Sequence, residues 1–247
     1  MKKIVTIATF MIILIVSGCS GNKQNQQQNQ QEVLPVDDSQ QEVLPVDDSQ
    51  QEVPSVNDPE SIIVLVNKKY SFPEGYEPKD LVYPDVAFIF KEKIDKRMMR
   101  EEAAKYLEKM FNAAKKMNIH LAGVSAYRSS QTQATLFNNY VEKDGIEKAK
   151  TYSAAPGTSE HQSGLAIDVS GTNGSCAADD CFANTEESAW LEDNAHKYGY
   201  IIRFPKEKEH ITGYQYEPWH IRYVGVNLAT ELYNKELTLE EYYDLHL

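Results

Sequence analysis

Two short stretches of this chain carry side chains that can bind a metal ion. The first covers residues 159–168 and contains His161 and Asp168, and the second covers residues 217–220 and contains Glu217 and His220. Together they supply two imidazoles, one carboxylate that could ligate and one further carboxylate. Three protein ligands, a water in the fourth position and a carboxylate to take its proton are the components of an open hydrolytic metal site. The sequence therefore indicates metal-assisted hydrolysis.

The first stretch leads into an apolar run, residues 165–169, that we expect to be a strand. Period-two alternation places Asp168 on one face of this strand and the larger apolar side chains on the other. A carboxylate in such a strand is costly unless it is paired or bound to a metal. Gly164 allows a tight bend, so that His161 could fold back toward Asp168. The alternative is a lone aspartate on a half-exposed strand with a surface histidine nearby.

The second stretch opens another predicted strand, residues 219–224, which is rich in aromatic and β-branched side chains. Pro218 keeps Glu217 out of helical geometry, so Glu217 enters at the mouth of the strand, three residues before His220. A ligating carboxylate would have to touch the metal, whereas a base has to touch only its water. The alternative is a solvated glutamate beside a half-buried histidine.

The two stretches form a pattern, Ser-x-His-x-x-Gly-x-Ala-x-Asp followed by Glu-x-Trp-His, that resembles a known family. It is similar to the zinc D-alanyl-D-alanine carboxypeptidases of the VanY type and to their relatives, the L,D-carboxypeptidases called LdcB. The resemblance covers roughly residues 81–223. It implies that His161, Asp168 and His220 bind Zn²⁺, that Glu217 is the catalytic base, and that the substrate is the stem peptide of peptidoglycan.

Arg128 follows a predicted strand, residues 119–127, and precedes a helical pattern over residues 134–141. An arginine at a strand end suits bidentate capture of a carboxylate, and its charge could also stabilise an oxyanion. Composition alone favours an ordinary surface arginine, but the Tyr-Arg-Ser sequence followed by Gln133 matches the family, which implies a catalytic and substrate-binding role for Arg128. Gln133, Ser153 and Ser159 are weaker candidates for substrate contacts, since each could instead cap a turn.

The resemblance leaves the specificity open. An L,D-carboxypeptidase removes D-alanine from a tetrapeptide stem, whereas a D,D-carboxypeptidase removes it from a pentapeptide ending in D-Ala-D-Ala. We favour the L,D activity because the whole pattern, including the N-terminal region, is more like the LdcB branch. A non-catalytic wall-binding lipoprotein with a structural zinc is the remaining alternative, and the intact Glu217 argues against it.

The N-terminus resembles a bacterial lipoprotein signal. Lys2 and Lys3 precede an apolar segment, residues 4–16, that is too short to span a bilayer comfortably, and the sequence Val-Ser-Gly-Cys follows. We expect residues 1–18 to be a signal peptide and Cys19 to be lipid-modified, which would anchor the protein to the extracellular face of the bacterial cell membrane through this lipid alone. A plain secretory signal and an uncleaved anchor are the alternatives.

Residues 19–60 are predicted to form a flexible, glutamine-rich acidic tether. The ten-residue sequence at 31–40 recurs at 41–50, and so few large apolar residues cannot build a core. The remaining residues, 61–247, form one catalytic domain. The net charge of −12 argues against nucleic acid or an anionic membrane surface as a partner. Nothing in the sequence suggests more than a monomer.

Within the catalytic domain, predicted helices and strands do not alternate regularly. We therefore expect an α+β fold with a small antiparallel sheet and flanking helices, and the resemblance implies the hedgehog/D,D-peptidase fold. Besides the segments above, helices are predicted over 99–114, 190–198, 226–237 and from Thr238, with a strand over 200–204.

Cys176 and Cys181 flank a four-residue loop just after the strand that carries Asp168. In an exported protein they could form a disulfide that closes this loop. Two free thiols or a second metal site are the alternatives, and no third soft ligand lies nearby in the sequence.

Overall fold

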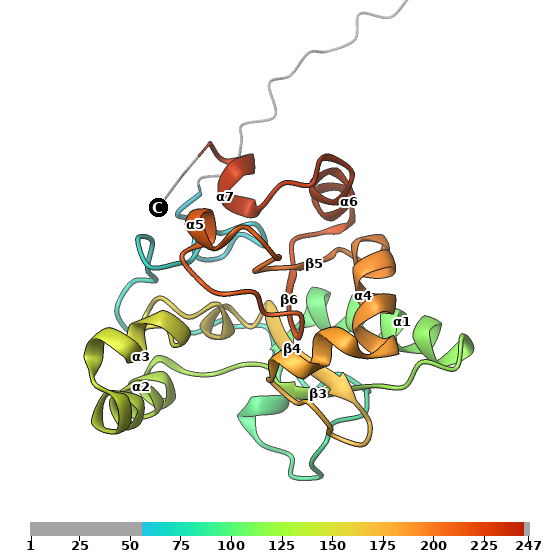
Figure 1. Cartoon of the computed structure of the whole chain (residues 1–247), viewed down its shortest axis with the longest axis horizontal. Coiled ribbons are helices and arrows are strands. Elements are labelled where there is room, and N and C mark those ends of the chain that lie inside the picture. Colours follow the sequence, from blue (N-terminus) through green and yellow to red (C-terminus); the bar gives the residue numbers. More distant parts are fainter. Residues whose placement is uncertain (1–55, 245–247) are drawn as a thin grey trace, which may run out of the picture. The chain divides into compact units, whose positions relative to one another are not determined.

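The computed structural model describes residues 56–244. The predicted signal peptide, the lipidation site Cys19 and most of the predicted tether lie outside this range, as do the last three residues. Among the described residues, no helix is both long enough and apolar enough to cross a bilayer. Figure 1 shows strands at the centre with helices on several sides.

The centre of the fold is a four-stranded antiparallel sheet with strand order β3-β4-β6-β5. A two-stranded antiparallel pair, β1 with β2, lies before it in the sequence. This arrangement confirms the predicted α+β class. The strands are β1 (Leu81–Val82), β2 (Met99–Arg100), β3 (Leu121–Ser125), β4 (Ala166–Gly171), β5 (Tyr200–Ile202) and β6 (His220–Tyr223).

Seven α-helices surround the sheet among the described residues. In the view of Figure 1, α1 and α4 lie to the right of the sheet, α2 and α3 to its left, and α5 to α7 above it. Their bounds are α1 (Glu101–Lys116), α2 (Ser130–Asp144), α3 (Ile146–Tyr152), α4 (Glu186–Asn194), α5 (Glu209–Thr212), α6 (Val226–Lys235) and α7 (Leu239–Tyr242).

The main core lies between α1, α4 and one face of the sheet. In α1, residues spaced three or four apart are completely buried, as on the inner face of an amphipathic helix: Ala103, Leu107, Met110 and Ala114. They belong to one apolar cluster with Ile167 of β4 and Ile221 of β6, which are direct cross-strand partners. The core therefore fixes which face of these two strands points away from it.

The next position along each of these strands points to the opposite face, because side chains alternate. In the β4–β6 register Asp168 pairs with His220, and in the β3–β4 register Ser125 pairs with Asp168. Three strands thus bring polar side chains to the middle of the sheet's second face. β4 is buried along its whole length, so Asp168 does not lie on a half-exposed strand.

Several element boundaries differ from the predicted ones. The predicted strand 200–204 ends at Ile202, shortly before Pro205, which has no N–H to donate to a ladder. The predicted helix 190–198 begins earlier, as α4, and continues as a 3₁₀ turn to Tyr198. It ends, as predicted, at Gly199 in the left-handed conformation. The last helix, α7, begins directly after Thr238, as predicted, and has a capping box between Thr238 and Glu241.

Candidate metal centre and substrate pocket

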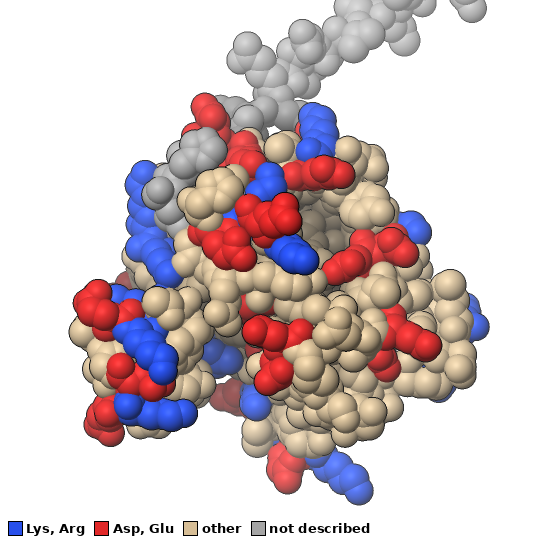
Figure 2. All heavy atoms as spheres, viewed as in Figure 1, with Lys and Arg blue, Asp and Glu red and all other residues tan. Residues whose placement is uncertain are grey.

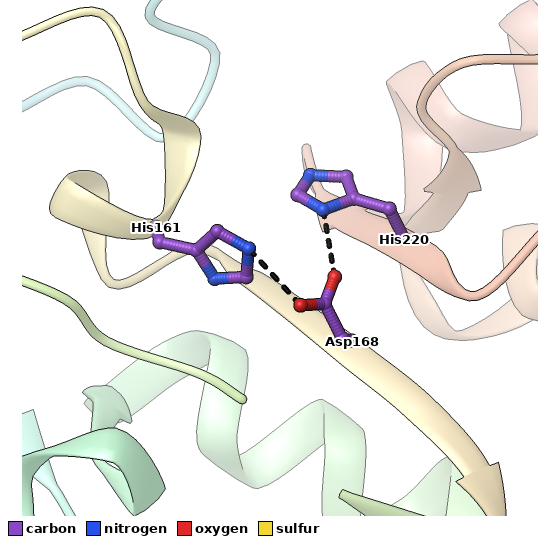
Figure 3. A group of neighbouring side chains, drawn as sticks. All are labelled: His161, Asp168 and His220. Atoms are coloured by element: carbon purple, nitrogen blue, oxygen red, sulfur yellow. Dashed lines mark hydrogen bonds and ion pairs between the residues drawn. The ribbon is translucent and has the colours of Figure 1, made fainter. Parts of the chain in front are cut away.

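His161, Asp168 and His220, here called the metal triad, converge on one point (Figure 3). Asp168 Oδ2 lies 3.3 Å from His161 Nε2, and Asp168 Oδ1 lies 3.0 Å from His220 Nδ1. All three residues are buried, and their ligand atoms lie within 4.8 Å of one another. Zinc takes nitrogen and oxygen ligands at about 2.0–2.2 Å, so atoms this close together can share one ion. The donor set fits Zn²⁺.

Local backbone geometry brings His161 to the triad. His161 lies in a 3₁₀ turn, Glu160–Ser163, that ends at Gly164 with φ +67°. A Cβ at Gly164 would lie 2.7 Å from a side-chain carbon of Leu81, so both the backbone conformation and the space require glycine there. The bend predicted at Gly164 is therefore present, and it folds His161 back toward Asp168.

The two histidines present different nitrogens to the centre. His161 Nδ1 lies 2.7 Å from the carbonyl oxygen of Ala126, which leaves Nε2 facing Asp168. His220 is reversed: Nδ1 faces Asp168, and Nε2 lies 3.4 Å from Glu160 Oε2. A ligating histidine usually donates its other N–H to a carboxylate or carbonyl, which sets its tautomer. Both histidines have such a partner.

The protonation states of the three triad residues favour the release of a proton when a cation binds. Burial would raise the pKa of Asp168, but the two histidines hold that pKa well below its usual range. Burial lowers the pKa of His161. Although burial opposes it, hydrogen bonds with Asp168 and Glu160 raise the pKa of His220 to about 9. Without a metal, His220 thus carries both of its ring protons at neutral pH, and an incoming cation would displace one of them.

Glu217 lies beside the triad as a partly buried carboxylate. Its backbone N–H bonds to the carbonyl of Phe204, which fixes it at the entry to β6. Burial raises the pKa of Glu217 to about 7, opposed by His220 and assisted by Asp168 and Glu160. A carboxylate with a pKa near neutrality can both accept and return a proton, as a general base requires.

Arg128 is held in place by neighbouring polar groups. Its Nη1 donates to Gln133 Oε1 at 2.8 Å, and its Nη2 donates to Ser125 Oγ at 3.2 Å. Gln133 is buried at the start of α2 and donates to the carbonyl of Ala154 at 2.6 Å. Gln133 therefore orients Arg128, whereas the sequence made it a candidate for a substrate contact or a turn cap.

A single pocket of about 450 Å³ joins these groups, and we call it the substrate pocket. It contains the metal triad, the adjacent carboxylate and every predicted substrate-binding residue. Tyrosines, a tryptophan and two further aspartates also line it, and of these only Trp219 belongs to a motif identified in the sequence. Its lining includes His161, Asp168, His220, Glu217, Arg128, Gln133, Ser153, Ser159, Tyr140, Tyr152, Tyr214, Trp219, Asp179 and Asp180.

A disulfide joins Cys176 and Cys181, whose Cα atoms lie 5.4 Å apart. The loop that it closes contributes Ala178, Asp179 and Asp180 to the edge of the substrate pocket. The bond thus limits the movement of a segment that lines the substrate pocket.

A second hollow, of about 840 Å³, lies between β5, α5, α6 and α7 and contains none of the predicted site residues. Figure 2 shows it opening among acidic and basic side chains that are mixed over this face, with no large patch of one sign. The chemistry described above therefore belongs to the smaller pocket.

Behind the metal triad lies a set of four buried charges, Glu160, Arg203, Arg222 and Glu240, which we call the ion network. Glu160 Oε1 accepts from Arg203 Nε at 2.7 Å and from Arg222 Nη1 at 2.6 Å. Arg203 also donates to both oxygens of Glu240, at 2.8 and 2.6 Å. Local sequence patterns did not predict this network, because its members are distant in the sequence and two of them are single arginines in strand-like segments.

The α+β fold, the triad and its neighbouring carboxylate agree with the comparison to known proteins. Residues 96–226 match the family described as VanY, D-alanyl-D-alanine carboxypeptidase, and the chain belongs to this family. It is 52% identical to the putative carboxypeptidase YodJ of Bacillus subtilis (strain 168) over 183 residues, which are 74% of this chain and 67% of YodJ.

The solved structures that are similar to this one include an L,D-carboxypeptidase and a D,D-pentapeptidase. The LdcB LD-carboxypeptidase is 52% identical, with a TM-score of 0.73, over 76% of this chain and 88% of that one. A mutant of the vancomycin resistance D,D-pentapeptidase VanY in complex with Zn(II) is 31% identical, with a TM-score of 0.60, over 73% of this chain and 98% of that one.

Proposed function

We propose that this protein is a zinc-dependent carboxypeptidase that releases the C-terminal D-alanine from peptidoglycan stem peptides. The observation that carries the proposal is the convergence of three groups in one pocket: the metal triad, Glu217 and the oriented Arg128. A structural zinc site needs neither a neighbouring base nor an arginine. The similarity to LdcB and to the zinc-bound VanY supports the same activity.

Zn²⁺ held by the triad would lower the pKa of a water and polarise the scissile carbonyl. Arg128 binds the terminal carboxylate of the substrate, since Gln133 and Ser125 already fix the direction of its guanidinium. Glu217 accepts the proton of the attacking water and passes it to the leaving amine of D-alanine. Ser153 and Ser159 line the pocket where they can bond the peptide backbone.

Within this activity we favour the L,D specificity. In a tetrapeptide stem, the residue just before the scissile bond is a diamino acid with an ammonium on its side chain. Asp179 and Asp180 lie at the edge of the substrate pocket, and Asp180 is close enough to Glu217 to raise its pKa. An acidic wall beside the base suits a cation next to the scissile bond. The D,D activity remains the second candidate, supported by the similarity to the D,D-pentapeptidase VanY.

We further propose that the enzyme acts outside the cell, where Cys19 would carry the lipid and residues 19–60 would let the domain reach the wall. This rests on the sequence alone, because Cys19 lies outside the described residues. A hydrolase of peptidoglycan needs access to the wall, and no nucleic-acid partner is expected.

The test is mass spectrometry of synthetic tetrapeptide and pentapeptide stems incubated with the purified protein, with and without a chelator. Chelator-sensitive loss of one alanine from the tetrapeptide supports the L,D activity, and loss only from the pentapeptide supports the D,D activity. Glu217→Gln is expected to keep its zinc but to lose turnover by more than about a hundredfold. Glu209→Gln, an exposed glutamate outside the substrate pocket, is the matched control and should retain full activity.

A further inference from the structure

Glu160 neighbours His161 in the sequence, yet its carboxylate belongs to the ion network behind the other histidine. It is 4% exposed, and both of its oxygens are engaged. Oε1 accepts from the two guanidinium groups of Arg203 and Arg222, and Oε2 faces His220 Nε2 at 3.4 Å. Glu160 therefore links a set of balanced buried charges to one ligand of the metal triad.

The carboxylate of Glu160 has little freedom to turn. Arg222 donates from Nη2 to the carbonyls of Ile62 and Val64, at 3.1 and 2.9 Å. Arg203 is held by Glu240, which in turn accepts from Asn67 at 3.1 Å. These groups come from β6, from the chain just after β5, from α7 and from the segment before β1. The two arginines, which contact Glu160 directly, fix the direction in which Oε2 points.

The ring of His220 has a single orientation that satisfies its surroundings. Phe204 stacks on it, with ring centroids 5.1 Å apart and planes 26° apart, so the ring cannot tilt freely. Within that plane, Nδ1 points to Asp168 and Nε2 to Glu160. A neutral imidazole has one N–H and one lone pair, so an acceptor at Nε2 leaves the lone pair on Nδ1, where a metal can use it.

We infer that Glu160 is a positioning residue for the metal centre: anchored by Arg203 and Arg222, it accepts the Nε2–H of His220 and thereby presents Nδ1 to the ion. The inference rests on the metal site of the proposed function and not on hydrolysis. It assigns Glu160 a task beyond stability.

The chain offers a matched pair of variants. In Glu160→Gln, the amide oxygen takes the place of Oε1 between the two arginines, and the amide NH₂ then faces His220 Nε2. A donor there favours the N–H on Nδ1, the atom that must bind the metal. In Glu240→Gln, the same charge is lost from the same network, but Glu240 does not contact His220. Both variants should lower the melting temperature of the metal-free protein.

Zinc affinity, measured by competition with a chromophoric chelator, separates positioning from stability. We expect the Zn²⁺ dissociation constant to rise about 10–100-fold in Glu160→Gln and to stay within about twofold of wild type in Glu240→Gln. Unchanged affinity in Glu160→Gln, or an equal loss in both variants, would overturn the inference. A wild-type protein that binds zinc but releases no alanine would contradict the proposed function and leave this inference standing.

Discussion

Two clusters of buried polar side chains lie side by side in this protein, and their charges are arranged differently. The ion network contains two arginines and two glutamates, so its formal charges cancel. The metal triad contains one ionised carboxylate between two imidazoles. One cluster is complete within the chain, and the other is completed by a proton or a cation.

The difference indicates what each cluster contributes. Arginine cannot give up its proton in a protein, so the ion network is fixed in charge, and its cost of burial is offset only while all members are present. Histidine can release its proton near neutral pH, so the triad adapts to the loss or gain of a charge. Substitutions in the triad should therefore affect function, and substitutions in the network should affect stability, with Glu160, which contacts His220, affecting both.

Asp168→Asn tests the triad and has the largest expected effect. Zinc loses its only anionic ligand, so turnover of stem peptides should fall by more than about a hundredfold. This exceeds the loss of about 10–100-fold that is usual when a residue hydrogen-bonded to a metal ligand is replaced. The metal-free protein should lose the stabilisation that the Asp168–His220 pair provides at neutral pH and no more, because His220 can release its proton once the carboxylate charge is gone. A loss of stability as large as the one expected for Arg222→Met would contradict the proposed difference between the triad and the ion network.

Arg222→Met tests the ion network. Two carboxylates would then share the one guanidinium of Arg203, and the carbonyls of Ile62 and Val64 would lose their donor. Breaking a buried ion pair by removing one partner costs about 3–5 kcal/mol, which chemical denaturation of the metal-free protein would measure. Arg222→Lys, which keeps the charge but not the forked geometry, should fall between wild type and Arg222→Met.

The sequence predicted the triad because its members stand in two compact motifs with distinctive spacing. The alternation around Asp168 and the bend at Gly164 are local properties, and both are present in the structure. What local patterns could not supply is the register. Asp168 and His220 are direct cross-strand partners although 52 residues separate them, and only the packing of the sheet selects that pairing.

The ion network was not predicted either, because its members also lie far apart in the sequence. Glu160 lies 43 residues from Arg203 and 62 from Arg222, and an arginine in a strand normally indicates a solvent-facing position. Both arginines are instead completely buried.

The short strands β1 and β2 have only two residues each, too few for any periodic signal. Helix α3 also went unpredicted; it follows Gly145 directly and has only seven residues.

The pH dependence of zinc binding has the smallest expected effect, and it tests directly whether the metal triad can change its charge. The pKa of His220 is raised to about 9 in the metal-free protein, while the pKa values of His161 and Asp168 are lowered. Between pH 7 and 8.5, zinc must therefore displace one proton, and its affinity should rise about tenfold per pH unit.

The stability of the metal-free protein should change in the opposite direction. Because the folded-state pKa of His220 exceeds its ordinary value of 6.5, the stabilisation is fully present below that pH and is lost as the pH rises through about 9. Chelator competition and denaturation over the same pH range would measure both trends. Zinc affinity independent of pH would mean that His220 is already neutral, and the triad would then be as fixed in charge as the ion network.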